Sequence, residues 1–162
     1  MAEACIELWD EHYMLTRETV LASVYHLPSA EAVVKRLYLN QTHLGNNLAL
    51  ATGDARLGRQ YTRLLKEHIR IAIEIVGAAL AGHDIKPLVA AWKANGTEIA
   101  RFLSGVTGAP EADLDHHMQK HLTTTLREAV DAIHHRDALT SGQRALDHVR
   151  EMAKVLAQLL FG

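Results

Sequence analysis

The sequence lacks the features that mark several large classes of protein. Its single cysteine, Cys5, cannot form a disulfide within the chain, so a disulfide scaffold and a cysteine-rich zinc motif are both excluded. The longest apolar stretch, Ile71 to Ala81, contains Glu74 and is too short to span a bilayer as a helix. No basic, apolar leader precedes the first helical pattern. We therefore expect a cytoplasmic protein that does not bind a membrane.

An excess of positive charge is also absent. The chain has 17 basic and 19 acidic residues, and its formal net charge of -2 offers no electropositive surface for nucleic acid. None of its ten glycines belongs to a glycine-rich loop of the kind that holds phosphates between a strand and a helix. We therefore expect neither a nucleic-acid partner nor a nucleotide cofactor.

The apolar residues follow a helical pattern. They recur at steps of three and four along most of the chain, and no stretch alternates in the way a strand requires. Proline, glycine and capping residues divide the pattern into helices at roughly 6–26, 29–53, 54–82, 84–105, 110–136 and a last one after Thr140, Ser141 and Gly142. The short connections predict an up-and-down bundle of about six helices in a single domain, residues 1–162.

Histidine is the residue type that stands out. The chain contains eleven histidines, roughly three times the number expected from ordinary usage. His12, His68 and His121 each lie three or four residues from apolar residues on one face of a predicted helix. The three helices are the first, third and fifth, which run parallel in an up-and-down bundle. The pattern therefore predicts three imidazoles in the bundle interior.

These positions suggest a metal site. Neutral imidazole binds divalent zinc, iron, copper or nickel, and Glu98 on the fourth helix is the predicted carboxylate ligand beside His12, His68 and His121. Four other polar residues on the packing faces are expected to support the site by hydrogen bonds, namely Asn95, Asn40, Glu128 and Thr16. The leading hypothesis is a metal- or small-ligand-binding bundle, and whether it is an enzyme is left open.

Two observations keep an alternative open. The chain has no HExxH motif and no pair of Glu-x-x-His elements, so no local motif supports the metal site. Buried histidines are also commonly hydrogen-bonded residues of a core, without a functional role. The alternative is a non-enzymatic interaction or oligomerisation module that forms a homodimer, in which the histidines are structural.

Several segments carry a resemblance that runs through most of the chain. They are LWDEHYMLTRETV at Leu8–Val20, the Leu27-Pro28 stop, RLYLNQTHLG at Arg36–Gly45, LLKEH at Leu64–His68, WKANGTEIARFL at Trp92–Leu103 and HLTTTLREA at His121–Ala129. With these segments the chain resembles a family of small bacterial all-helical proteins that have no assigned activity. The resemblance implies a helical fold and leaves the function open.

Overall fold

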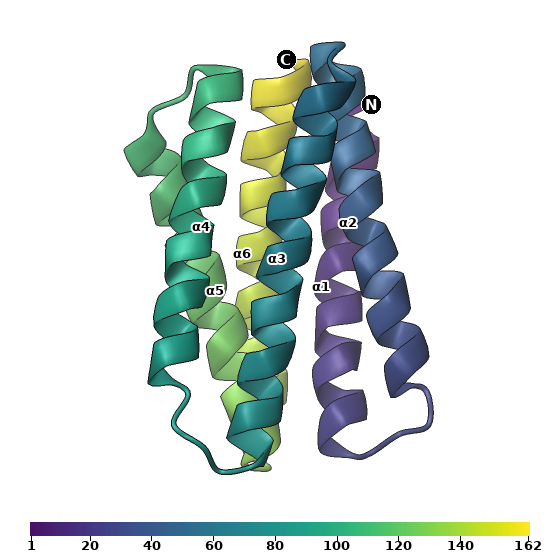
Figure 1. Ribbon diagram of the computed structural model, residues 1–162, viewed down its shortest axis with the longest axis vertical. Coiled ribbons are helices and arrows are strands. Elements are labelled where there is room, and N and C mark those ends of the chain that lie inside the picture. The colour runs from purple at the N-terminus through teal and green to yellow at the C-terminus, as the bar shows by residue number, and fades with distance from the viewer.

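The computed structural model describes residues 1–162 as an up-and-down bundle without strands (Figure 1), which confirms the predicted fold class. Its six helices are α1 (Ala2–Val24), α2 (Ala30–Thr52), α3 (Ala55–Leu80), α4 (Lys86–Thr107), α5 (Glu111–Ile133) and α6 (Ala138–Phe161). None of these helices is long and apolar enough to cross a membrane.

The six helices form a closed ring. Each helix packs against the next one in the chain, and α6 returns to pack against α1. Because the helices alternate in direction, α1, α3 and α5 run parallel, and both chain ends lie at the same end of the bundle (Figure 1). The three parallel helices also contact one another across the middle of the ring. Residues on their inner faces therefore meet at the centre.

Capping residues explain several of the helix boundaries. Gly53 and Gly108 end α2 and α4 with φ values of 68° and 76°, the left-handed conformation that glycine adopts without strain. The predicted start of the last helix is wrong. The carboxylate of Asp137 accepts a hydrogen bond from the Thr140 backbone, so α6 begins at Ala138 and includes Gly142.

A polar layer interrupts the apolar core near mid-height. The main apolar cluster, of 19 buried residues, lies toward the end that holds both termini, whereas two clusters of four residues lie toward the other end. Between them every helix contributes a buried polar side chain, and the layer includes His12, Asn40, Gln41, His68, Asn95, His121 and His148. Buried polar groups need partners. This layer is therefore the first place to look for a site.

Helices α2 and α3 approach each other closely because both carry glycine at the contact. A Cβ on Gly58 would lie 2.5 Å from the carbonyl oxygen of Gly45 and 2.6 Å from the Cβ of Ala49. No larger residue fits there without moving the two backbones apart. The close contact fixes how α3, and with it His68, stands against α2.

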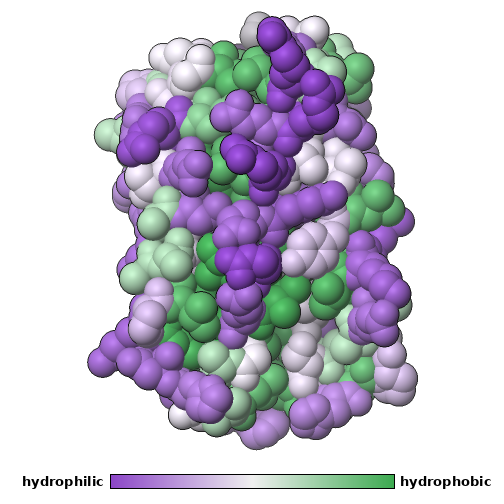
Figure 2. Space-filling model, viewed as in Figure 1, coloured by the Kyte–Doolittle hydropathy of each residue, from purple (hydrophilic) through white to green (hydrophobic).

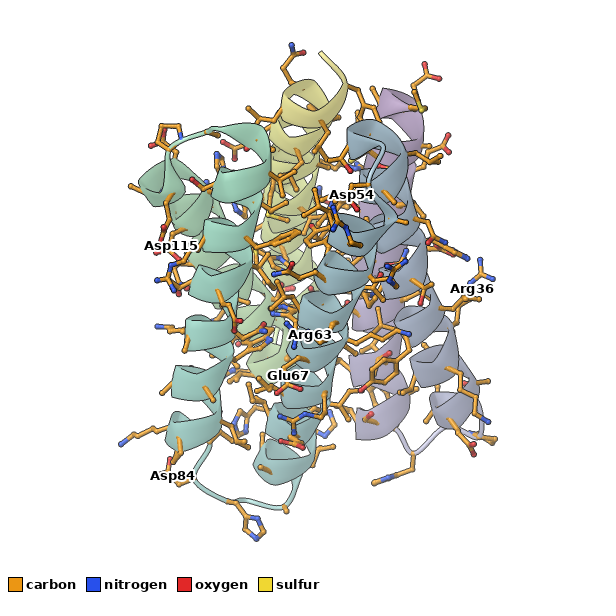
Figure 3. All side chains as sticks on the ribbon, turned by 45° about the horizontal axis from the view of Figure 1, so that its top comes forward. Arg36, Asp54, Arg63, Glu67, Asp84 and Asp115 are labelled. Carbon is orange, nitrogen blue, oxygen red and sulfur yellow. The ribbon has the colours of Figure 1, made fainter.

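The outer surface is mainly hydrophilic. On the face that Figure 2 shows, hydrophilic residues cover much of the surface and apolar residues appear in separate places between them. Charged side chains such as Arg36, Glu67 and Asp84 lie on the outside of the bundle (Figure 3). The residues that are unusual for their position are therefore the buried polar side chains of the layer at mid-height.

Candidate functional site

Three histidines lie side by side at the centre of the bundle. His12 on α1, His68 on α3 and His121 on α5 are only 2–3% exposed. The ring centroid of His121 lies 5.9 Å from that of His12 and 5.9 Å from that of His68. The structure therefore brings together the three histidines that the sequence pattern predicted to point inward.

The two tryptophans of the chain flank these histidines. Trp9 lies edge-on to His12 at 5.1 Å between ring centroids, and Trp92 stacks on His68 at 5.0 Å. The indole N–H of Trp92 donates to the backbone carbonyl of His68 at 3.1 Å. Five aromatic rings thus follow one another across the core.

His68 has a defined protonation state. Its Nδ1 lies 2.8 Å from Oδ1 of Asn95, while the amide nitrogen of Asn95 donates to the carbonyl of Leu64 at 3.3 Å. Because Oδ1 is only an acceptor, His68 Nδ1 must carry the proton. The Nε2 atom of His68 therefore presents a lone pair, as a metal ligand requires.

Two amides of α2 surround the ring of His12. The Gln41 Nε2 lies 3.2 Å from His12 Nδ1, 2.8 Å from the carbonyl of Leu37 and 3.1 Å from Oδ1 of Asn40. The Oε1 atom of Gln41 is buried and has no hydrogen-bond partner. An unpaired acceptor in a core is costly, so this point of the site lacks a donor.

All three imidazoles are neutral in the folded protein. Burial lowers the pKa of His12 to about 3, with a further decrease from nearby His68. Burial also lowers the pKa of His68 to about 4, although its hydrogen bond with Asn95 acts in the opposite direction. The pKa of His121 lies well below its ordinary value because of burial and of the two neighbouring histidines. Desolvation disfavours the charged form in each case.

A small cavity adjoins two of the histidines. It has about 10 Å³ of room for the centre of a water-sized sphere, enough for roughly one water molecule. His12 and His121 form part of its wall, together with Tyr13, Thr16, Arg17, Val20, Thr125, Glu128 and Ala129. The cavity is therefore walled mainly by polar side chains and is too small for an organic ligand.

Glu128 and Arg17 form an ion pair at the edge of this cavity. Burial raises the pKa of Glu128, and the charge and hydrogen bond of Arg17 partly offset that increase. The hydroxyl of Tyr13 donates to the carbonyl of Gly142 at 2.8 Å and lies 3.3 Å from Glu128. A Cβ on Gly142 would lie 2.6 Å from Glu128, so α6 comes this close only because it has glycine there.

The structure corrects one predicted ligand. Glu98 is exposed on α4 and lies outside the cluster, because the inner face of α4 presents Asn95, Ile99 and Trp92 instead. The other predicted supporting residues do lie near the histidines. Asn95 bonds His68, Asn40 lies beside Gln41, and Thr16 and Glu128 line the cavity.

No group of three or more His, Cys, Asp or Glu side chains is arranged in this structure so that it can hold a metal ion. The three imidazoles are adjacent, but their nitrogens do not converge on one point. The only cysteine does not contribute either, since burial raises the pKa of Cys5 to about 11 and keeps the thiol protonated.

Sequence reasoning missed several residues of the site. Gln41 follows Asn40 directly and is equally buried, and Arg17 and Tyr13 lie on the inner side of α1. The spacing of Tyr13 and Arg17, four residues apart, was the available signal, since it places both on one helix face. His148 was a further omission; its Nε2 donates to the carbonyl of His117 at 2.9 Å.

The fold and the site define a closed six-helix bundle with a histidine layer at its centre. No protein-family model, no curated protein and no solved structure matches the chain. The resemblance given by the sequence segments therefore stays a prediction.

Proposed function

We propose that the centre of the bundle binds one divalent transition-metal ion through the Nε2 atoms of His12, His68 and His121. The observation that carries the proposal is the arrangement of three buried imidazoles from three parallel helices, with centroids 5.9 Å apart in both neighbouring pairs. All three are neutral near pH 7, the form in which histidine binds zinc, copper, nickel or iron.

The spacing of two of the three ring pairs is close to that of a metal site. With metal–nitrogen bonds near 2.1 Å, two imidazoles on one tetrahedral ion have ring centroids roughly 5.3 Å apart. The observed spacing is 5.9 Å in both pairs. Movements of less than about 1 Å bring these two pairs to that distance, and His12 and His68, which lie on either side of His121, must also turn their Nε2 atoms toward a common point. The cavity beside His12 and His121 provides room for that movement.

The hydrogen bonds around the rings support the same function. Histidine ligands usually donate their second ring N–H to an acceptor, which fixes the tautomer. For His68 this acceptor is Oδ1 of Asn95. At His12 the Gln41 amide donates toward Nδ1 at 3.2 Å, so binding through Nε2 requires this ring to turn until its Nδ1–H faces an acceptor such as Oδ1 of Asn40. A water bound to the metal supplies the donor that Gln41 Oε1 lacks.

The two tryptophans provide a direct assay. Trp9 and Trp92 are the only tryptophans, and both contact rings of the proposed site. Protein purified without a histidine tag and stripped with a chelator is titrated with Zn²⁺, Co²⁺ and Ni²⁺ while the intrinsic fluorescence is recorded. We expect one equivalent to bind, with elemental analysis giving the same stoichiometry.

The ligands are tested by a pair of variants. His68→Ala removes a central imidazole, whereas His83→Ala removes an exposed one from the loop between α3 and α4. We expect His68→Ala to weaken binding more than about 100-fold, since loss of a hydrogen-bonded partner of a ligand already costs about 10–100-fold. His83→Ala should bind like the wild type. Equal affinities of the two variants refute a shared central site.

A second candidate function is homodimerisation, with the histidines serving only the packing. It is favoured by Met14 and Leu139, large apolar side chains that are 66% and 75% exposed. Both line one surface groove of about 440 Å³ between α1 and α6. In this case light scattering over a concentration series gives a dimer that Leu139→Lys dissociates. A monomer at every concentration excludes this candidate.

A further inference from the structure

We infer that Glu128 is the carboxylate ligand of the proposed metal site, and that Arg17 neutralises Glu128 until a divalent cation displaces it. The inference rests on the proposed metal-binding function. It assigns to Glu128 the role that the sequence pattern gave to Glu98, and it adds a competitor for that ligand.

Glu128 forms part of the wall of the cavity. Glu128 is the only carboxylate among the residues that line it, and it shares the cavity with His12 and His121. The Glu128 side chain is 7% exposed, whereas Glu98 lies on the outer surface. A cation in the cavity therefore has two of the three proposed imidazole ligands and one carboxylate around it, whereas His68 does not line the cavity and lies beside His121.

Glu128 and His121 lie on the same side of α5. His121, Thr125 and Glu128 are spaced by four and three residues, so they lie on one face of the helix. Side chains of an α-helix lean toward its N-terminus, which directs Glu128 toward His121. The carboxylate and the imidazole thus approach the cavity between them from the same helix.

Arg17 lies between the internal cavity and the surface. Its side chain is 29% exposed, and it lines both the internal cavity and the surface groove between α1 and α6. Rotation of the side chain moves its guanidinium into water in that groove. Glu128 has no such option, because it is buried and needs a positive charge nearby.

The exchange raises the net charge at this point of the bundle from zero to +1, because a divalent cation takes the place of one guanidinium. The ion pair between Arg17 and Glu128 breaks, the guanidinium is hydrated in the groove, and the carboxylate oxygen binds the cation. No proton or electron is transferred in this step.

The test compares three variants in Zn²⁺ titrations of the chelator-stripped protein. Glu128→Gln removes the ligand charge but keeps the shape, and Arg17→Met removes the competing cation. Asp131→Asn is the matched control, because Asp131 is also buried on α5 and paired with arginines, but it does not line the cavity. Circular dichroism establishes that each variant is folded.

We expect the first two variants to act in opposite directions. Glu128→Gln should weaken Zn²⁺ binding about 10–100-fold, Arg17→Met should strengthen it about 10-fold, and Asp131→Asn should leave it unchanged. If Glu128→Gln does not fold, the direction of the Arg17→Met effect decides the question alone.

Two other results have distinct meanings. If His68→Ala abolishes binding while Glu128→Gln and Arg17→Met bind like the wild type, the inference is overturned and the proposed function stands. If the wild-type protein binds none of the metals, both are overturned.

Discussion

Acidification should destabilise the metal-free protein strongly, and the three central histidines are the reason. In the unfolded chain a histidine takes up a proton as the pH falls through about 6.5. In the folded protein the pKa of His12 is about 3 and that of His68 is about 4. Between these limits only the unfolded state gains protons, so the free energy of unfolding falls as the pH falls.

The size of the effect follows from linkage. Each histidine that stays neutral in the folded state lowers the free energy of unfolding by about 1.4 kcal/mol per pH unit below pH 6.5. At pH 5 this is about 2 kcal/mol each, or about 4 kcal/mol for His12 and His68 together. His121 adds to the loss, because its pKa is lowered as well. An ordinary domain has about 5–15 kcal/mol of stability, so a protein at the low end of that range unfolds near pH 5 and a more stable one loses a large part of its stability.

The assay is urea denaturation followed by circular dichroism at pH 7.5, 6.5, 5.5 and 5.0, with a chelator present. His68→Gln should reduce the slope of unfolding free energy against pH by about 1.4 kcal/mol per unit between pH 6 and 5. His83→Gln is the control, since His83 is exposed. A wild-type stability that is equal at pH 7.5 and 5.0 would refute the reasoning, as would an unchanged slope in His68→Gln.

Three further outcomes follow from the packing. Gly58→Ala should lower the free energy of unfolding by about 1–3 kcal/mol in the same urea assay, because the added Cβ collides with α2. A Cβ added at Gly77 has no atom within 4 Å, so Gly77→Ala should raise the free energy of unfolding by about 0.5–1 kcal/mol. Asn95→Leu should weaken Zn²⁺ binding about 10–100-fold in the fluorescence titration, because His68 loses its acceptor. Gly142→Ala should lower the thermal midpoint by displacing the ion pair beside it.

The sequence was sufficient to predict the helices and the inward direction of the three histidines. Helical periodicity depends on local spacing, and His12, His68 and His121 share faces with large apolar residues on their own helices. The up-and-down order then made α1, α3 and α5 parallel. Because each histidine lies near the middle of its helix, the three also meet at one height.

The identity of the carboxylate was not predictable in the same way. Glu98 and Glu128 both lie close in sequence to apolar positions of their helices. Which of them faces inward depends on the rotation of each helix in the ring, and this is set by contacts between helices distant in sequence. Gly142 on α6 illustrates the point, since its lack of a side chain matters only because Arg17 and Glu128 lie against it.

The polar layer is also hard to explain as a device for stability alone. Keeping three imidazoles neutral destabilises the fold in acid, and the Oε1 of Gln41 has no partner in the core. Apolar residues of similar size, such as those at Leu65 and Leu122 beside two of the histidines, fill a core without either cost. A sequence that follows the rules of packing in the rest of its core departs from them here, and such departures are expected where a protein binds or reacts. The metal titration is therefore the experiment that bears most directly on why this layer exists.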